Sequence, residues 1–222
     1  MMNHTEDKPK FIRLPEERFS CYSHMAGGIL AVIGTLILII VSAGELAKIV
    51  VSLLYGLSIS FLFFASTMYH AHKQSENEKT VWRKLDHIAI FVMIAGTYTP
   101  ISFIYLTGGW RLGILIAQWF LVVVGIVLKL LIINTPRWVT ILIYLLQGWM
   151  AVLPLYFLLT IMPISSFILM ALGGIAFTIG AIIYAVKKPD PKPGVFGFHE
   201  IFHVLILIGA GLHYVMVWQA LI

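Results

Sequence analysis

The sequence carries very little charge for its length. Only 11% of its 222 residues are charged, whereas 60% are hydrophobic. A soluble domain of this size usually has about a quarter of its residues charged. The shortage of charge therefore excludes an ordinary soluble domain and indicates an integral membrane protein.

Cysteine and long polar segments are also scarce. The single cysteine, Cys21, excludes a disulfide within the chain, and we expect it to pack as a small apolar side chain. Only residues 1–20 and the segment 71–84 are polar over any length. Neither leaves room for a separate soluble domain. We therefore predict an N-terminal segment at 1–20 and a single membrane domain at 21–222.

What the sequence does contain is a series of apolar stretches long enough to cross a bilayer, which takes roughly 20 residues. The separators between them are short and rich in turn-forming residues. The first stretch is longer than the roughly 7–15 apolar residues of a signal peptide, so we expect it to be retained. The predicted fold class is an all-α integral membrane protein, a bundle of seven transmembrane helices. Their predicted ranges are about 22–43, 49–70, 87–106, 112–133, 138–159, 164–186 and 199–220.

The basic residues fall almost entirely on one side of this arrangement. Of the 15 Lys and Arg residues, all but Lys48 and Arg111 precede the first predicted helix or lie in or close to the loops after the second, fourth and sixth. The positive-inside rule then predicts a multi-pass protein of the cell membrane with its N-terminus in the cytoplasm and its C-terminus outside. This distribution explains the net charge of +5, and we expect no nucleic-acid partner. Nothing in the pattern indicates an oligomeric state.

Ionisable residues gather at helix ends on the predicted cytoplasmic side. His24 begins the first predicted helix, His70 ends the second, Asp86 begins the third, and His199 and His203 begin the seventh. Ionisable groups inside a membrane are costly and tend to pair or to bind ions. We therefore expect these side chains to meet at one depth, just inside the cytoplasmic boundary.

The stretch FHEIFH at 198–203 contains H-E-x-x-H, a pattern typical of zinc proteases. His199 and His203 would share a helix face about 6 Å apart, although two histidines reaching towards water would look the same. No acidic residue follows Glu200, and His213 would lie about 15 Å further along the helix than His203. We therefore interpret the protease match as accidental, with Glu200 turned away, and expect a third ligand from upstream, with His70 as the best candidate.

Four stretches taken together resemble hemolysin III proteins, the bacterial branch of the progestin and adipoQ receptor family. They are SHMAGGILAVIG at 23–34, STMYH at 66–70, LDHIAIFVMIAGTYTPI at 85–101 and GVFGFHEIFHVLILIG at 194–209. The resemblance covers nearly the whole chain and implies a seven-helix zinc-binding fold shared with the alkaline ceramidases.

The same resemblance implies a set of site residues. In it Zn²⁺ is bound by His70, His199 and His203, Asp86 touches the water on the metal, and Ser66 lies nearby. One departure stands in the N-terminal motif EERFSCYSH, where Ser20 occupies a position at which the family leads us to expect asparagine.

Three functions from different classes fit these observations. The first is a zinc-dependent membrane hydrolase of lipid amide or ester bonds, because three imidazoles leave the metal an open position for water. In it Asp86 would be the general base, and Ser66 would donate to the developing oxyanion or to a helix carbonyl. The second is a non-catalytic sensor of lipid state that serves membrane homeostasis. The third, a pore-forming cytolysin, ranks last because the spans offer few polar residues to line a channel. For the first two, the expected partner is a membrane lipid or fatty-acyl chain within the bundle.

Overall fold

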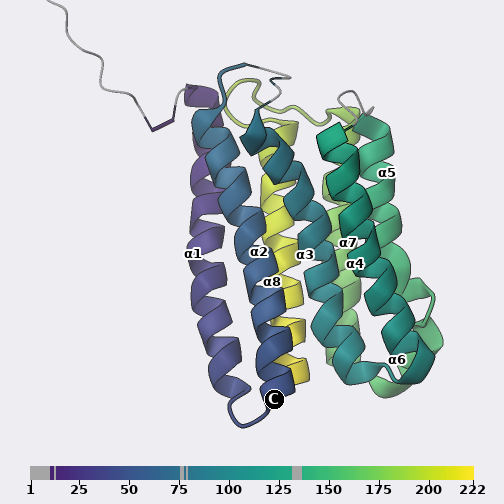
Figure 1. Cartoon of the computed structure of the whole chain (residues 1–222). Helices are drawn as coiled ribbons and strands as arrows, with labels where there is room; N and C mark the ends of the chain where they lie inside the picture. Colours follow the sequence, from purple (N-terminus) through teal and green to yellow (C-terminus); the bar gives the residue numbers. More distant parts are fainter. Residues whose placement is uncertain (1–10, 13, 76–77, 79, 132–136) are drawn as a thin grey trace, which may run out of the picture.

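The computed structural model describes residues 11–12, 14–75, 78, 80–131 and 137–222, and these form a bundle of helices that run side by side (Figure 1). Much of the predicted N-terminal segment, including Lys8, Lys10 and Arg13, lies outside the described residues. The elements are η1 (Pro15–Glu17), α1 (Arg18–Val41), α2 (Leu46–His72), α3 (Val81–Tyr105), α4 (Gly108–Leu131), α5 (Arg137–Gly148), η2 (Trp149–Val152), α6 (Leu155–Ile161), α7 (Ile164–Val186) and α8 (Phe198–Leu221).

Six of these helices are each long and apolar enough to cross a membrane. A seventh span is formed by α5, η2 and α6 together, and it bends by 52° at the junction before α6. The predicted bundle of seven membrane-spanning helices is confirmed in this form. One detail was wrong, because a continuous helix was expected at 138–159. Pro154 has no N–H with which to continue the helical hydrogen bonds, and the chain bends there.

The helix ends near the expected site also differ from the prediction. The third helix begins at Val81, inside the segment 71–84 that was expected to be a polar loop. The hydroxyl of Thr80 caps it by accepting a hydrogen bond from the Arg83 N–H over 3.3 Å. Asp86 consequently lies in the second turn of α3 rather than at its start.

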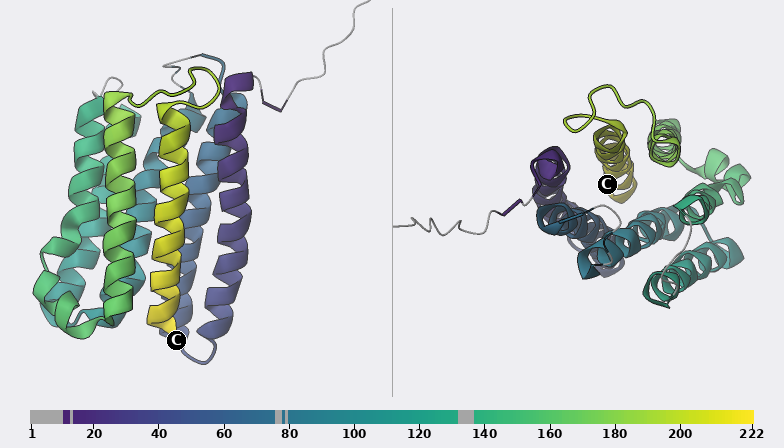
Figure 2. Two further views of the ribbon diagram at one scale, coloured as in Figure 1. Left: turned by 180° about the vertical axis from the view of Figure 1, so that it is seen from behind. Right: turned by 90° about the horizontal axis from the view of Figure 1, so that it is seen from above.

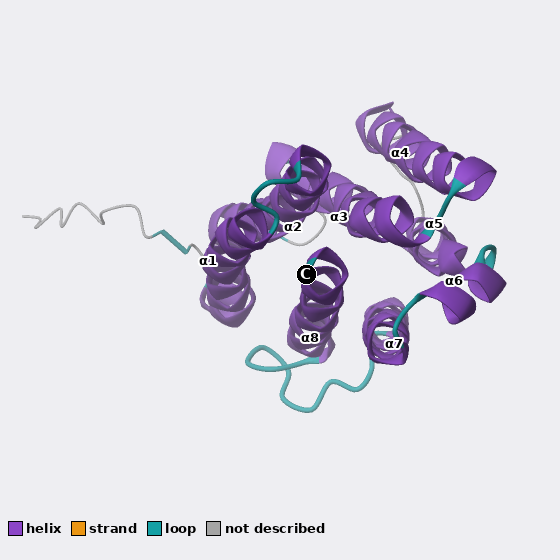
Figure 3. Cartoon of the chain, turned by 90° about the horizontal axis from the view of Figure 1, so that it is seen from below, coloured by secondary structure: helices purple, strands orange, loops and turns teal. Residues whose placement is uncertain are grey.

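Seen along the bundle axis, α1, α2, α3, α5, α7 and α8 surround a common interior, and α4 packs on the outer side of α3 (Figures 2 and 3). In α3, 67% of the 18-residue apolar window is buried, compared with 22% in α4. Helix α3 therefore faces protein on several sides, whereas α4 presents most of its surface to lipid.

A close approach of α1 to its neighbours positions the residues of the candidate site. A Cβ atom at Gly27 would lie 2.7 Å from Leu207 Cδ2 on α8 and 2.9 Å from Phe63 Cε1 on α2. Real side chains do not tolerate such contacts, so glycine lets α1 pack against both helices. The start of α1, the end of α2 and the starts of α3 and α8 meet at one end of the bundle, and the C-terminus lies at the other (Figure 1).

Candidate metal centre

Three histidines from two helices converge at that end of the bundle. His70 lies in the last turn of α2, and His199 and His203 lie in the first two turns of α8. The Nε2 atom of His199 is 3.2 Å from Nε2 of His203 and 3.5 Å from Nε2 of His70. One ligand atom from each residue lies within 4.8 Å of the others. A cluster of this kind could hold a metal ion.

The outer nitrogen of His70 has a partner on the N-terminal element. Nδ1 of His70 donates to Oε2 of Glu17 over 2.6 Å, and Nζ of Lys73 donates to Oε1 of Glu17 over 2.5 Å. Glu17 and His70 are both buried. The carboxylate therefore lies between a histidine of the cluster and a lysine beyond it.

Ser66 is paired with a histidine that is not in the cluster. Its Oγ lies 2.8 Å from Nδ1 of His24, and both side chains are buried. The His24 ring lies against that of His203, with ring centroids 3.8 Å apart. The sequence left open an oxyanion or a helix carbonyl as the partner of Ser66. The hydrogen bond found among the described residues is with His24.

Glu200 and His213 have roles outside the cluster. Oε2 of Glu200 accepts a hydrogen bond from the Gly197 N–H over 2.7 Å, which caps the first turn of α8. Its other oxygen lies 3.4 Å from Oγ of Ser20. Nε2 of His213 lies 3.1 Å from the carbonyl oxygen of Met170 on α7. Glu200 thus serves helix capping although it stands within the H-E-x-x-H string.

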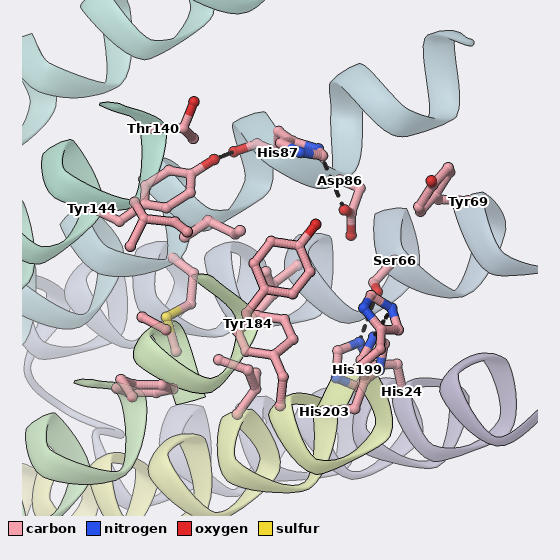
Figure 4. Close-up of a pocket in the computed structure, with 18 of the residues that line it drawn as sticks. His24, Ser66, Tyr69, Asp86, His87, Thr140, Tyr144, Tyr184, His199 and His203 are labelled. Carbon is pink, nitrogen blue, oxygen red and sulfur yellow. Dashed lines mark hydrogen bonds and ion pairs between the residues drawn. The ribbon is translucent and has the colours of Figure 1, made fainter. Parts of the chain in front are cut away.

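The cluster forms part of the wall of a cavity of about 780 Å³ between the helices. Asp86 and His87 line the same cavity, and Asp86 Oδ2 lies 3.6 Å from Nδ1 of His87. In the view of Figure 4, the Asp86 side chain lies between His87 and the group formed by Ser66, His24, His199 and His203. Deeper in the bundle the lining becomes mainly apolar, with Leu62, Met93, Ile94, Phe177 and Ile206. The cavity therefore joins a polar end with imidazoles and a carboxylate to an apolar end.

Known proteins resemble this chain over most of its length. A family model described as haemolysin-III related matches residues 12–214. The chain belongs to the haemolysin-III-related family. It is 34% identical over 204 residues to Hemolysin-3 of Bacillus cereus, covering 89% of this chain and 88% of that protein. It is 31% identical over 201 residues to the Hemolysin-3 homolog of Bacillus subtilis strain 168, covering 89% and 90%.

A more distant match extends the relationship beyond the bacterial branch. A stretch of 49 residues is 47% identical to the heptahelical transmembrane protein ADIPOR2 of Oryza sativa subsp. japonica, covering 20% of this chain and 21% of that protein. The resemblance to hemolysin III proteins and the link to the progestin and adipoQ receptor family are thus confirmed. The family membership and the apolar helices together make the chain a multi-pass membrane protein.

Sequence reasoning about this haemolysin-III-related chain missed Glu17 as a site residue. It lay in a segment that was expected to precede the membrane domain. A signal for it is nevertheless present, because Glu17, Ser20 and His24 are spaced three and then four residues apart and so share one helix face. All three contact residues of α2 or α8 near the cluster.

Proposed function

We propose that the histidine cluster binds Zn²⁺. Two nitrogens, each ~2.05 Å from one tetrahedral ion, lie about 3.3 Å apart. The Nε2 separations of 3.2 and 3.5 Å are close to this spacing and support the proposal. Imidazole nitrogens also suit zinc better than they suit the oxygen-preferring ions Mg²⁺ and Ca²⁺. His70, His199 and His203 would be the protein ligands, which leaves a fourth position open, as in catalytic sites.

We further propose that the protein is a zinc-dependent hydrolase of an amide or ester bond in a membrane lipid. The observation that carries this proposal is the cavity, which has the histidine cluster and Asp86 in its wall at one end and apolar side chains beyond them. It is also lined by Tyr98, which lies about 18 Å further along α3 than Asp86. A fatty-acyl chain would fit along this apolar part, with the bond to be cleaved beside the cluster.

In this proposal Asp86 and Ser66 would have separate roles in the reaction. When bound, zinc supplies a Lewis acid and lowers the pKa of a bound water towards ~7. The Asp86 carboxylate, in the wall of the same cavity, would accept a proton as general base. The Ser66 hydroxyl, oriented by Nδ1 of His24, would hydrogen-bond to the substrate oxygen as negative charge develops on it.

The test compares wild type, Asp86→Asn and His70→Ala in the release of fatty acid from ceramides and phospholipids. Loss of a general base typically slows a reaction by about 10²- to 10⁴-fold. We expect Asp86→Asn to keep its zinc but to lose at least this much turnover, and His70→Ala to lose both. If zinc-loaded wild type cleaves no lipid in the panel, the sensor function is favoured instead. Undiminished turnover in Asp86→Asn would remove the general-base role from Asp86.

We propose that the end of the bundle that carries the cluster faces the cytoplasm. That end of the bundle carries the starts of α1 and α3, the ends of α2 and α4 and the loop between α7 and α8 (Figure 1). These segments hold the basic residues Arg18, Lys73, Arg83, Lys84, Lys129, Lys187, Lys188 and Lys192, whereas Lys48 and Arg111 lie in the first turns of α2 and α4. Reporter fusions after residues 84 and 192 should therefore report a cytoplasmic position. Fusions after residue 108 and at the C-terminus should report the outside. A cytoplasmic C-terminus would reverse the orientation of the whole bundle.

A further inference from the structure

Glu17 is an acidic residue in an unusual position. Its side chain belongs to a residue only 6% exposed, at the start of the first membrane-spanning segment. The neighbouring Glu16 is exposed. A buried carboxylate is costly unless it is hydrogen-bonded and paired with opposite charge. Glu17 meets both conditions, because one oxygen accepts from Nδ1 of His70 and the other from Nζ of Lys73.

The hydrogen bond from His70 fixes which of its ring nitrogens is available to a ligand. An ionised carboxylate can only accept hydrogen bonds, so Nδ1 of His70 must carry the proton that it donates. In a neutral imidazole the other nitrogen, Nε2, then presents its lone pair. Nε2 of His70 is the atom that lies 3.5 Å from Nε2 of His199. The contact with Glu17 thus directs the lone pair of His70 into the cluster.

His203 differs from His70 in this respect. Within the described part of the chain, Nδ1 of His203 is buried and has no hydrogen-bond partner. Its ring is held instead by packing against the His24 ring. His70 is the histidine of the cluster whose outer nitrogen is held by a carboxylate, and that carboxylate comes from a different helical element.

The N-terminal helices η1 and α1 place Glu17 next to His70. Pro15 begins the short helix η1, and the Glu17 N–H donates to the Leu14 carbonyl over 3.1 Å. Further along the same helix face, Ser20 contacts Glu200 and His24 contacts Ser66. The N-terminal motif therefore packs as an outer layer on the cluster, with Glu17 as its buried carboxylate.

We propose that Glu17 is a positioning residue for the metal ligand His70, which it holds in the Nδ1-protonated form with Nε2 directed at the ion, and that Lys73 holds Glu17 in turn. Metal-binding histidines commonly donate their other ring N–H to such an outer partner, which orients the ring and raises its basicity. This inference rests on the proposed metal site, but it does not depend on the hydrolytic reaction.

The test measures metal binding by the full-length protein in detergent. The variants are Glu17→Ala, Glu17→Gln and, as a matched control, the exposed neighbour Glu16→Gln. Zn²⁺ affinity is measured by competition with a chelator, and the visible spectrum is recorded after saturation with Co²⁺. We expect Glu17→Ala to weaken Zn²⁺ binding by about 10- to 100-fold. Glu17→Gln should weaken it less, because the amide oxygen can still accept from Nδ1 but carries no negative charge.

The Co²⁺ spectrum separates positioning from simple support of the fold. If Glu17 acts on the ligand, the bands of the saturated Glu17→Gln protein will shift relative to wild type, and those of Glu16→Gln will not. If Glu17 only ties α1 to α2, unfolding of the metal-free protein will become easier while the spectrum stays unchanged, and that result overturns the proposal. If Glu17→Ala fails to fold, the Co²⁺ spectrum and the Zn²⁺ affinity of the isosteric Glu17→Gln variant test the proposal.

The remaining outcomes distinguish this inference from the proposed function. Zn²⁺ affinities of both Glu17 variants within twofold of wild type would overturn the role of Glu17 and leave the metal site standing. A wild type that binds no Zn²⁺ would overturn the metal site and the role of Glu17 together. A wild type that binds Zn²⁺ but cleaves no lipid would refute the hydrolase alone.

Discussion

The histidine cluster and the stretch of the fifth span just before its bend, at Gly148 and Trp149, line the same cavity, but they are held together in different ways. At the cluster, side chains from separate helices bond to one another, as in the contact of His70 with Glu17. At the bend, one side chain bonds to main-chain groups. The Tyr98 hydroxyl donates to the Gly148 carbonyl over 2.6 Å and accepts from the Ala151 N–H over 2.7 Å.

This difference indicates what each region contributes. A main-chain group without a partner costs several kcal/mol in the hydrocarbon of a membrane, so a bent span needs substitutes for the lost helical hydrogen bonds. Tyr98 supplies them and thereby stabilises the fold. The histidine side chains of the cluster are not needed to satisfy main-chain groups, and their Nε2 atoms lie close to one another. We therefore expect changes at the cluster to affect metal binding first and changes at the bend to affect stability first.

The largest effect should come from His203→Ala. Wild type should carry about one Zn²⁺ per chain, and the variant should lose most of it because one of three ligands is gone. The unfolding midpoint should also fall, since the metal would tie α2 to α8 and its binding energy would contribute to folding. Metal analysis of the purified protein, together with thermal unfolding with and without a chelator, checks both expectations.

His213→Ala is the matched control for that experiment. His213 lies on the same helix and is partly buried, but its Nε2 contacts the Met170 carbonyl instead of the cluster. This variant should retain its zinc, as should Glu200→Ala. If His213→Ala loses as much zinc as His203→Ala, then the loss reports a disturbed α8 and the cluster is no longer distinguished from the rest of the helix.

The sequence was sufficient to predict the seven spans but not the shape of the fifth. Hydropathy reports length and apolarity, and those alone predict the number of spans. It does not say how a proline will act within a span. Pro100 lies inside α3, which continues without a break, whereas the chain bends at Pro154. The outcome also depends on groups distant in the sequence that bond to main-chain atoms of the bent span, such as Tyr98, fifty residues away from Gly148.

The site was predictable to the extent that its residues follow local spacing. His199 and His203 are four apart on one helix, and the predicted depth of the helix ends made His70 the best candidate for a third ligand, as the family resemblance also implied. The structure brings His70 next to them. Their role as metal ligands, and that of Asp86 and Ser66 in catalysis, stay predictions. Glu17 could not be inferred in the same way, because its contact with His70 joins residues 53 positions apart. Such a contact depends on how α1 packs against α2, which local periodicity does not determine.

The smallest effect should come from Tyr98→Phe. Removal of the hydroxyl leaves the Gly148 carbonyl and the Ala151 N–H without this partner, at an expected cost of about 1–3 kcal/mol in the free energy of unfolding. For a chain of this size the unfolding midpoint should fall by several degrees, at roughly 2–4 °C per kcal/mol. The zinc content should stay at the wild-type value, since no ligand has changed. Thermal unfolding and metal analysis on the same preparation test this directly.

Tyr156→Phe provides the matched control within the same bent span. Tyr156 lies on α6 and is 74% exposed, so removal of its hydroxyl should leave the unfolding midpoint unchanged. A loss of zinc in Tyr98→Phe as large as in His203→Ala would show that the bend and the cluster form one cooperative unit. An unchanged midpoint in Tyr98→Phe would mean that water or lipid headgroups replace the tyrosine hydroxyl, and that the bend does not depend on it. Only a lower unfolding midpoint together with an unchanged zinc content in Tyr98→Phe agrees with separate roles for the two regions. In that case the bend region stabilises the span and the cluster binds the metal.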